Sequence, residues 1–534
     1  MLLVIPALLM LLAAVLIVAI DKISKNFAIA FLVASISAFA AWLVTLFSRI
    51  YLPSTLLLIP WKPETLYPYA PSLLLDYQSW PFALAIISIC IAGIFTDSAR
   101  SSTESNPRSW AGILSISALG MIALLSGNPF TLMMTWTLLD IVEFIHFITS
   151  NKNRDFDVGS IIVLSFHISS LIMLGWAIMV GWHEIGKPFD ITNIPANASV
   201  YFLLSAGLRL GILPLSLFDQ SKPQFSRGID TIVRLVPVAS SLSLIGRLSN
   251  TILLAHPILM ALFQAIIALT ALFAAITWIK EKDEVKSQLR WITAFSAFSL
   301  FSAVNGNQIS SRVWGIALLL SGGLFFLYQP KIWRLRFLLL FGVLGIIALP
   351  YTPAAAGWEG IIGDHFNLWS LIIMIAHVIL VLGYMRNFQN SLATSDNLET
   401  WAKIIFPLGL IILIQSSLII GVIGWPGSFS LGVWWFSAIN VFLTASIFFV
   451  FWRYKIDDIV KKLTGSNRSI HTLINILKVM SNVSLIKWIR GLFVTVSKLL
   501  SSLLININNI LEGEGGVMWA LLILLLLITL IVST

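Results

Sequence analysis

Apolar stretches alternate with short polar segments along most of this chain. An α-helix that crosses the hydrocarbon core of a bilayer needs about 17–25 mostly apolar residues. By this measure the pattern predicts an all-α, polytopic membrane protein with about sixteen transmembrane helices. The predicted helices cover residues 2–20, 27–47, 79–96, 110–127, 130–149, 158–182, 200–218, 229–249, 256–279, 291–306, 312–329, 336–350, 366–385, 403–424, 429–452 and 516–533.

The composition excludes a soluble protein of this size, because 58% of the 534 residues are hydrophobic and only 11% are charged. The single cysteine, Cys90, lies inside an apolar run, so neither a disulfide framework nor redox chemistry is expected. The net charge of +9 does not indicate nucleic acid, since the cytoplasmic loops of membrane proteins are rich in Lys and Arg. We therefore expect the chain to be embedded in a lipid bilayer.

Basic residues between the predicted helices indicate the orientation. Seventeen Lys and Arg residues follow odd-numbered helices, and only four follow even-numbered helices. The odd loops are therefore predicted to be cytoplasmic, with the N-terminus outside a cell membrane of bacterial type. The run at 2–20 has no basic segment before it and is predicted to be a retained helix. The outer loop at 51–80, rich in Pro, Tyr and Trp, is compatible with an ordered hairpin or with an interfacial loop.

The stretch from Tyr201 to Arg234 combines apolar helices with charge. A charge at membrane depth costs a few kcal/mol or more, so Arg209 in helix seven is a functional candidate. Pro214 and Pro237 each remove a helix donor, and helices seven and eight are predicted to break there. We expect Arg209 and Arg234 to belong to an ion path. The alternative is that these arginines pair with phosphates or carboxylates and only orient the helices.

Helix five carries three titratable side chains, Asp140, Glu143 and His146, three residues apart. This spacing places them along one side of the helix over two turns, and they resemble a proton relay. The alternative is a static pair between Arg209 and Asp140 or Glu143. A pair and a relay are compatible, because a moving proton can switch a carboxylate beside an arginine. His167 in helix six is open between a core residue and a relay member.

Helix twelve is predicted to be interrupted as well, by Pro350 and Pro353, with Glu359 beyond the break. Helices seven and twelve lie five helices apart. Because five is odd, matching five-helix units have opposite orientations, as expected for inverted repeats. Helices four to eight and nine to thirteen are the predicted repeats.

The C-terminal part changes character after residue 452. Residues 453–509 are amphipathic and basic, which predicts a lateral helix along the cytoplasmic interface, before the final span. The alternative for this part is an independent membrane-surface anchor. The predicted organisation is 1–109 (first helices and outer loop), 110–250 (first repeat), 251–385 (second repeat), 386–452 (helices fourteen and fifteen) and 453–534 (lateral helix and last span).

Several segments between about residues 70 and 390 resemble the antiporter-like subunits of respiratory complex I, multisubunit cation/proton antiporters and membrane-bound hydrogenases. The lateral helix between two final spans is similar to that of the largest such subunit of complex I. The matching segments are SLLLDYQSWPFALAIISI at 72–89, the Trp136 helix, GLRLGILPLSLF at 207–218, the segment at 231–250, DEVKSQLRWITAFSAFS at 283–299, and the LP, TP and GW pairs at 349–358.

The resemblance implies a subunit without a redox centre that moves protons through two linked half-channels. Family members use a glutamate in helix five, a lysine in helix seven, a lysine or histidine in helix eight, and a lysine or glutamate in helix twelve. This chain departs from that pattern. The corresponding positions hold Thr137 (with Asp140 one turn on), Arg209, Arg234 nearby, and Ile361 (with Glu359 two residues before it).

We therefore expect a proton- or monovalent-cation-translocating, non-redox subunit of a complex similar to NADH:quinone oxidoreductase. Its expected partners are other membrane subunits, and no cofactor, metal or catalytic residue is predicted. The alternative is a structural or anchoring subunit that has lost or altered transport, since an arginine hardly releases its proton. A membrane glycosyltransferase would need an acidic metal site, and Asp457 and Asp458 lie among lysines.

Overall fold

The computed structural model describes residues 3–23, 26–59, 70–98, 107–150, 158–212, 227–248, 253, 256–281, 284–328, 335, 337–347, 349, 352, 354–363, 367–390, 401–428 and 433–454. Residues 1–448 form one compact unit, and the site described below lies within it. The predicted lateral helix and final span lie outside the described residues, as do Pro214, Pro350 and Pro353.

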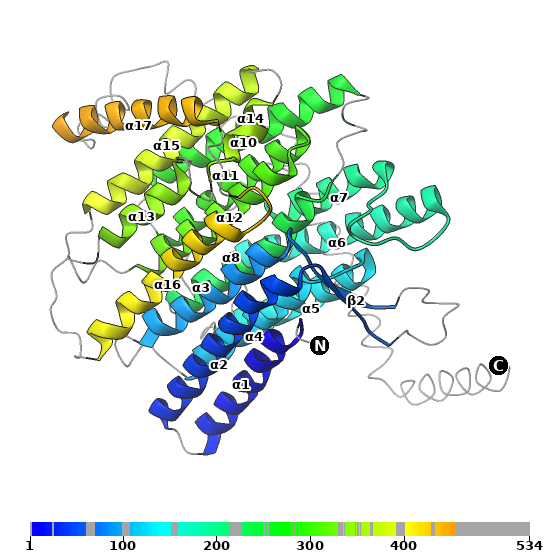
Figure 1. Cartoon of the computed structure of the whole chain (residues 1–534), viewed down its shortest axis with the longest axis vertical. Helices are drawn as coiled ribbons and strands as arrows, with labels where there is room; N and C mark the ends of the chain where they lie inside the picture. The colour runs from blue at the N-terminus through cyan, green and yellow to red at the C-terminus, as the bar shows by residue number, and fades with distance from the viewer. Residues whose placement is uncertain are drawn as a thin grey trace. The chain divides into compact units, whose positions relative to one another are not determined.

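The described part is built almost entirely of helices (Figure 1). Ten of the described helices are long and apolar enough to cross a membrane. The all-α polytopic fold is thereby confirmed, whereas the count of sixteen helices is not. The helices are α1 (Ile5–Ile23), α2 (Phe27–Ser48), α3 (Trp80–Ser98), α4 (Pro107–Leu124), α5 (Pro129–Ser150), α6 (Val158–Ile185), α7 (Ala196–Arg209), α8 (Arg227–Ile245), α10 (Pro257–Lys280), α11 (Glu284–Val304), α12 (Gln308–Leu327), α13 (Phe337–Ile346), α14 (Gly357–Ile362), α15 (Leu368–Asn390), α16 (Ala402–Ile423) and α17 (Trp434–Tyr454), with a 3-10 turn, η1 (Arg49–Tyr51).

The loop predicted to lie on the outer side contains an ordered hairpin. Strand β1 (Ser54–Leu57) pairs antiparallel with β2 (Ser72–Leu75), and Ser54 lies opposite Leu75. The backbone of β2 also bonds to the turn between α4 and α5, since Leu74 N–H donates to Leu125 O (2.6 Å) and Gly127 N–H to Ser72 O (2.8 Å). Of the two readings open for this loop, the hairpin is the one present.

Helices α3 and α8 form the centre of the bundle. In the 18-residue core of each, 94% of the residues are buried, against 33% in α1 and 28% in α2. A helix that is apolar all round is stable at the centre because other helices surround it, whereas an edge helix leaves apolar side chains for lipid. Helix α3 packs against α2, α4, α8, α12 and α16.

The two predicted five-helix units show matching contacts. In the first unit α4 packs on α8 and α6 on α7, and in the second α10 packs on α15 and α12 on both α13 and α14. Inverted and parallel repeats would both give such contacts. The two-fold relation itself stays a prediction, which superposition of α4–α8 on α10–α15 tests.

Helix seven ends at Arg209, before the proline predicted to break it. Gly211 has φ of 68°, a left-handed conformation that favours glycine. The N–H of Ile212 then turns back to bond Gly207 O (2.9 Å). A left-handed glycine with this backward bond is a common way to end a helix. Arg209 is thus placed at the terminus of α7 and not inside it.

The break predicted at Pro237 is wrong as a helix end, because α8 continues through this residue from Arg227 to Ile245. Proline lacks an N–H, so it removes one helix hydrogen bond, from the carbonyl of Val233, while close packing keeps the helix intact. The predicted interruption of helix twelve is present, since α13 ends at Ile346 and the next helix, α14, begins at Gly357.

Candidate functional site

A buried ion pair joins α5 to the end of α7. Arg209 Nη1 donates to Asp140 Oδ2 (2.9 Å) and Nη2 to Asp140 Oδ1 (2.5 Å). Only 7% of Arg209 and 5% of Asp140 is exposed. The predicted pair between Arg209 and a carboxylate of helix five is therefore confirmed, with Asp140 as the partner. Two parallel bonds between guanidinium and carboxylate fix orientation as well as charge.

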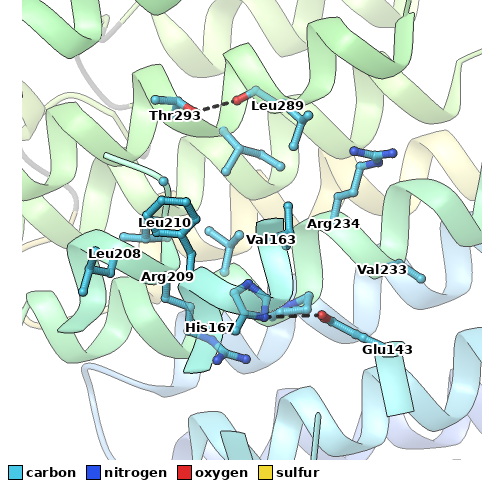
Figure 2. A pocket seen from close by; sticks show the side chains of 15 residues that line it. Glu143, Val163, His167, Leu208, Arg209, Leu210, Val233, Arg234, Leu289 and Thr293 are labelled. Carbon is cyan, nitrogen blue, oxygen red and sulfur yellow. Dashed lines mark hydrogen bonds and ion pairs between the residues drawn. The ribbon is translucent and has the colours of Figure 1, made fainter. Parts of the chain in front are cut away.

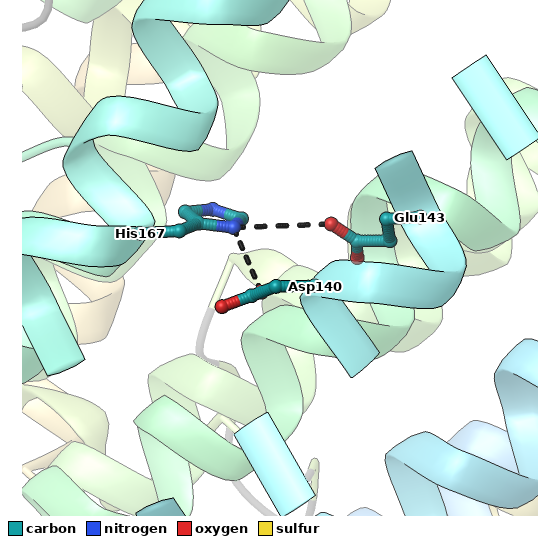
Figure 3. Close-up of side chains that lie close together, drawn as sticks. All are labelled: Asp140, Glu143 and His167. Atoms are coloured by element: carbon teal, nitrogen blue, oxygen red, sulfur yellow. Dashed lines mark hydrogen bonds and ion pairs between the residues drawn. The ribbon is translucent and has the colours of Figure 1, made fainter. Parts of the chain in front are cut away.

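His167 of α6 connects this pair to a second carboxylate (Figure 3). Its Nδ1 lies 2.9 Å from Asp140 Oδ1 and 3.9 Å from Glu143 Oε2. Glu143 is one turn after Asp140 on α5 and is 6% exposed. The sequence left His167 open between core and relay, and the geometry places it between the two carboxylates. We call Asp140, Glu143, His167 and Arg209 the charge cluster.

The charge cluster borders a cavity of about 120 Å³ (Figure 2). Glu143, His167 and Arg209 line one side, and Arg234 and Pro237 of α8 line another. A cavity of this volume has room for several water molecules. Among the described residues, Glu143 Oε1 is buried and has no hydrogen-bond partner. Glu143 is therefore the member of the cluster with an open acceptor beside the cavity.

Trp136 supports Arg209 from one turn before Asp140. Its ring centre lies 4.7 Å from the Arg209 guanidinium carbon. Its Nε1 donates to Ser240 Oγ of α8 (2.8 Å), and Ser240 Oγ donates to Pro237 O (3.0 Å). An aromatic face attracts a cation, more strongly when water is excluded. Trp136 thus fixes the arginine and ties α5 to α8.

Arg234 lies across the cavity on α8 and pairs with Asp230 one turn earlier, at 3.1 Å between Nε and Oδ1. This acid was missed in the sequence, although its i,i+4 spacing to Arg234 was the available signal. Pro237 leaves the carbonyl of Val233 without its helix donor, and both residues line the cavity. The part of the cavity lined by α8 therefore contains Arg234, whose charge Asp230 neutralises, and Val233, whose carbonyl lacks its helix donor.

The charges of the cluster do not balance by themselves. Arg209 compensates one of the two carboxylates, and the Asp230–Arg234 pair is neutral on its own. An uncompensated charge is expensive at this burial, so a further positive charge is required. One proton on Glu143 or His167, or one monovalent cation, would supply it.

The same side chains include potential metal ligands. One ligand atom each of Asp140, Glu143 and His167 lies within 4.8 Å of the others. Arg209, however, occupies both oxygens of Asp140 and would repel a divalent ion. The arrangement suits a single positive charge better than a divalent metal.

Glu359 is not brought to the cluster, and the position of the His146 side chain stays untested. Glu359 lies on α14 with an exposed side chain and is not among the cavity-lining residues. His146 lies in the last part of α5, and its side chain is outside the described structure. Neither residue gains support from the geometry as a member of the proton pathway.

A second charged group near the hairpin was not predicted. Arg247 donates to both oxygens of Asp76 (2.7 and 2.8 Å), and Arg312 Nε donates to Gln78 Oε1 (2.6 Å). Burial raises the pKa of the Asp76 carboxyl, but the charge and hydrogen bonds of Arg247, aided by Ser79, outweigh burial and hold that pKa below its usual range. This group joins the start of α3 to α8 and α12 and has a structural role.

Comparison with known proteins identifies the fold. No protein-family model matches the sequence. No curated protein matches it closely enough to count as a relative. Among solved structures, a chain of the Mrp complex from Dietzia sp. DQ12-45-1b matches with a TM-score of 0.66 and 12% identity, over 99% of this chain and 63% of that one. A chain of the membrane-bound sulfane sulfur reductase, an archaeal respiratory membrane complex, matches with a TM-score of 0.64 and 14% identity, over 98% of this chain and 99% of that one.

The chain thus spans less than two thirds of the Mrp chain and nearly all of the reductase chain. The TM-scores establish the shared fold, whereas identities this low leave the activity open. The resemblance to antiporter-like subunits, predicted from six short segments, is confirmed at the level of the fold. This chain therefore has the fold of the antiporter-like membrane subunits of multisubunit membrane complexes.

Proposed function

We propose that this chain is a cation-translocating membrane subunit whose charge cluster holds one exchangeable proton. The observation that carries the proposal is the charge count, since among the described side chains of the cluster two buried carboxylates share one arginine. The cavity beside Glu143, which has room for several water molecules, provides the side from which a proton can arrive. A purely structural pair would need neither the second carboxylate nor the histidine.

His167 provides the link between the two carboxylates. Its Nδ1 is within hydrogen-bond distance of Asp140 Oδ1, at 2.9 Å, and lies 3.9 Å from Glu143 Oε2, which is too long for a hydrogen bond. A small rotation of either side chain brings Glu143 into reach. Because an ionised Asp140 can only accept, His167 Nδ1 already carries a hydrogen. Nδ1 gives that proton to Asp140, and the proton taken up by Glu143 then replaces it on Nδ1. Protonated Asp140 holds Arg209 less strongly, because the charge that attracts the guanidinium is gone.

Arg209 itself does not carry the proton in this scheme. An arginine keeps its proton at any working pH, unlike the lysine that the family resemblance implies at this position. Its role is that of a fixed positive charge, which Asp140 holds strongly when ionised and weakly when protonated. Released from Asp140, the guanidinium is free to turn into the cavity that it lines together with Arg234.

We propose further that the chain is a non-redox subunit of a complex similar to NADH:quinone oxidoreductase or to the antiporter and respiratory complexes that share its fold. The N-terminus would lie outside the cell membrane, and the basic loops and lateral helix on the cytoplasmic side. The two repeats at 110–250 and 251–385 would form the translocating part. Support comes from the basic-residue bias and from the fold of the compared chains.

The test is ion flux through vesicles that contain the full chain together with the subunits that purify with it. Glu143→Gln and Asp140→Asn are expected to reduce proton flux at least tenfold, because neither amide can carry the proton. Asp190→Asn is the matched control, since Asp190 is exposed in the segment before α7. Flux is measured with and without Na⁺ to separate protons from other monovalent cations.

Assembly is measured in the same preparations by the yield of copurifying subunits. Loss of flux with intact assembly supports translocation through the cluster. Unchanged flux in both cluster variants would overturn the proposal and leave a structural subunit as the function.

A further inference from the structure

His377 is a histidine of α15 that is fully buried, with both ring nitrogens in hydrogen bonds. Its Nε2 lies 2.8 Å from Ile346 O and its Nδ1 lies 3.2 Å from Asn440 Oδ1. Both His377 and Asn440 are 0% exposed. The contacts join three helices, α13, α15 and α17. No sequence pattern had pointed to this residue.

The carbonyl that His377 meets is freed by the interruption of helix twelve. Ile346 is the last residue of α13, and its helical partner would be the N–H of residue 350. Residue 350 is proline, which has no N–H. A buried carbonyl needs a donor, and His377 Nε2–H supplies one. The histidine is therefore bound to the break in the helix itself.

The second ring nitrogen gives the site two states. Nδ1 faces an oxygen, and a neutral imidazole cannot donate from both nitrogens. When Asn440 Oδ1 faces Nδ1, a hydrogen bond forms only if the ring is protonated, because Nδ1–H must then donate to that oxygen. The neutral ring is satisfied when the Asn440 amide turns by half a turn, so that Nδ2 donates to Nδ1. Asn440 Nδ2 has no hydrogen-bond partner among the described residues, and the turn gives up only a long contact of 3.5 Å from Thr444 Oγ1 to Asn440 Oδ1.

The ring lies among aromatic side chains and not among charges. Ring centres of Trp358, Trp314 and Phe298 lie 5.0, 5.4 and 5.9 Å from its own. The charged residues nearest in sequence to these contacts are Arg312, which bonds Gln78, and Glu359, which is exposed. Neither forms an ion pair with His377 in the described structure. Aromatic faces attract a cation, so these rings are compatible with a protonated His377.

We propose that His377 is a proton-binding residue, and that its protonation is coupled to a half-turn of the Asn440 amide. Among the described side chains of residues 256–428, no carboxylate is buried. His377 is the buried group there whose ordinary titration lies nearest neutrality. Proton uptake turns Asn440 Oδ1 towards the ring, and proton loss turns Nδ2 towards it. The orientation of the Asn440 amide on α17 thereby follows the proton on His377.

The direct test is nitrogen-15 solid-state NMR of the full chain in lipid, with labelled histidine. The chemical shifts of Nδ1 and Nε2 distinguish the two neutral tautomers from imidazolium. The chain has 7 histidines, and the signal lost in His377→Gln is that of His377. We expect it to change from the Nε2–H tautomer to imidazolium as the pH is lowered. A signal that stays neutral with Nε2–H throughout the folded pH range would overturn the proposal.

Two variants of Asn440 test the coupling. In Asn440→Asp the carboxylate can only accept, so the midpoint of the His377 titration is expected to move up by about one pH unit or more. In Asn440→Leu the ring loses this partner, and the midpoint is expected to move down. Unmoved midpoints in both variants would show that the amide is not coupled. The wild-type titration remains decisive if a variant fails to fold.

A role of His377 in transport rests on the proposed function, and the experiments distinguish failure of the one from failure of the other. In the vesicle assay His377→Gln is expected to flatten the pH dependence of flux while assembly persists. If Asp140→Asn leaves flux unchanged but His377 titrates, the proposed function fails and the proton site stands. If Asp140→Asn abolishes flux but the His377 signal never titrates, the proton site fails and the proposed function stands.

Discussion

Arg209, the last residue of α7, donates two hydrogen bonds to the carboxylate of Asp140, which lies 69 residues earlier on α5. The pair is buried, so each charge depends on the other for its stability. The bond also holds the end of α7 beside α5 and α6, where His167 and Glu143 complete the charge cluster.

The first prediction concerns this pair as a unit. Arg209→Gln and Asp140→Asn are each expected to lower stability by about 3–5 kcal/mol, because each leaves a buried charge with less compensation. The double variant is expected to cost less than the sum, since neither member of the pair is then left without the other, and Glu143 is neutral when it holds the proton of the cluster. The measurement is thermal unfolding of the four proteins in one detergent. Additive losses would show that the two side chains are not energetically coupled.

The second prediction concerns Trp136, which contacts Arg209 with its ring and Ser240 with its Nε1. Trp136→Phe keeps an aromatic face and is expected to cost about 1 kcal/mol, the value of one hydrogen bond. Trp136→Leu removes the ring as well and is expected to cost about 1–2 kcal/mol more. Unfolding temperatures of the two variants are compared, and equal values would exclude a contribution from the aromatic face.

The third prediction is a pH dependence at the hairpin. The pKa of Asp76 is held below its usual range, so its pair with Arg247 stabilises the fold above the unfolded pKa of about 3.9. This stabilisation is lost as the pH falls through the folded pKa. Asp76→Asn is therefore expected to lower the unfolding temperature clearly at about pH 6 and much less near about pH 3. An equal difference at both values would contradict an ionised Asp76 as the cause.

The fourth prediction concerns the close packing of α4 on α8. A Cβ at Gly120 would overlap Val236 Cγ1, so Gly120→Ala is expected to destabilise the bundle by about 1–3 kcal/mol. Gly175 on α6 is the matched control, because a Cβ there meets nothing within 4 Å. Gly175→Ala is expected to be neutral or stabilising by up to about 1 kcal/mol. Unfolding temperatures separate the two, and equal effects would argue against tight α4–α8 packing.

Much of the fold follows from local pattern alone. A spanning helix must be long and apolar, and that requirement is visible in any window of the sequence. Predicted segments such as 27–47 and 403–424 accordingly match α2 and α16 within about two residues of each end. The end of α7 was placed too late, because Gly211 in a left-handed conformation stops the helix before the proline signal.

A polytopic helical membrane protein, candidate charges in helices five and seven, and an interruption in helix twelve could all be predicted from the residues alone. These depend on hydrophobicity and on the absence of an N–H in proline, which are properties of single residues and short runs. Only the tertiary structure decided that Asp140, and not Glu143, bonds Arg209, since both lie on the same side of α5. The packing also placed His377 between the carbonyl of Ile346 and the amide of Asn440, because α13, α15 and α17 must pack together before those groups meet.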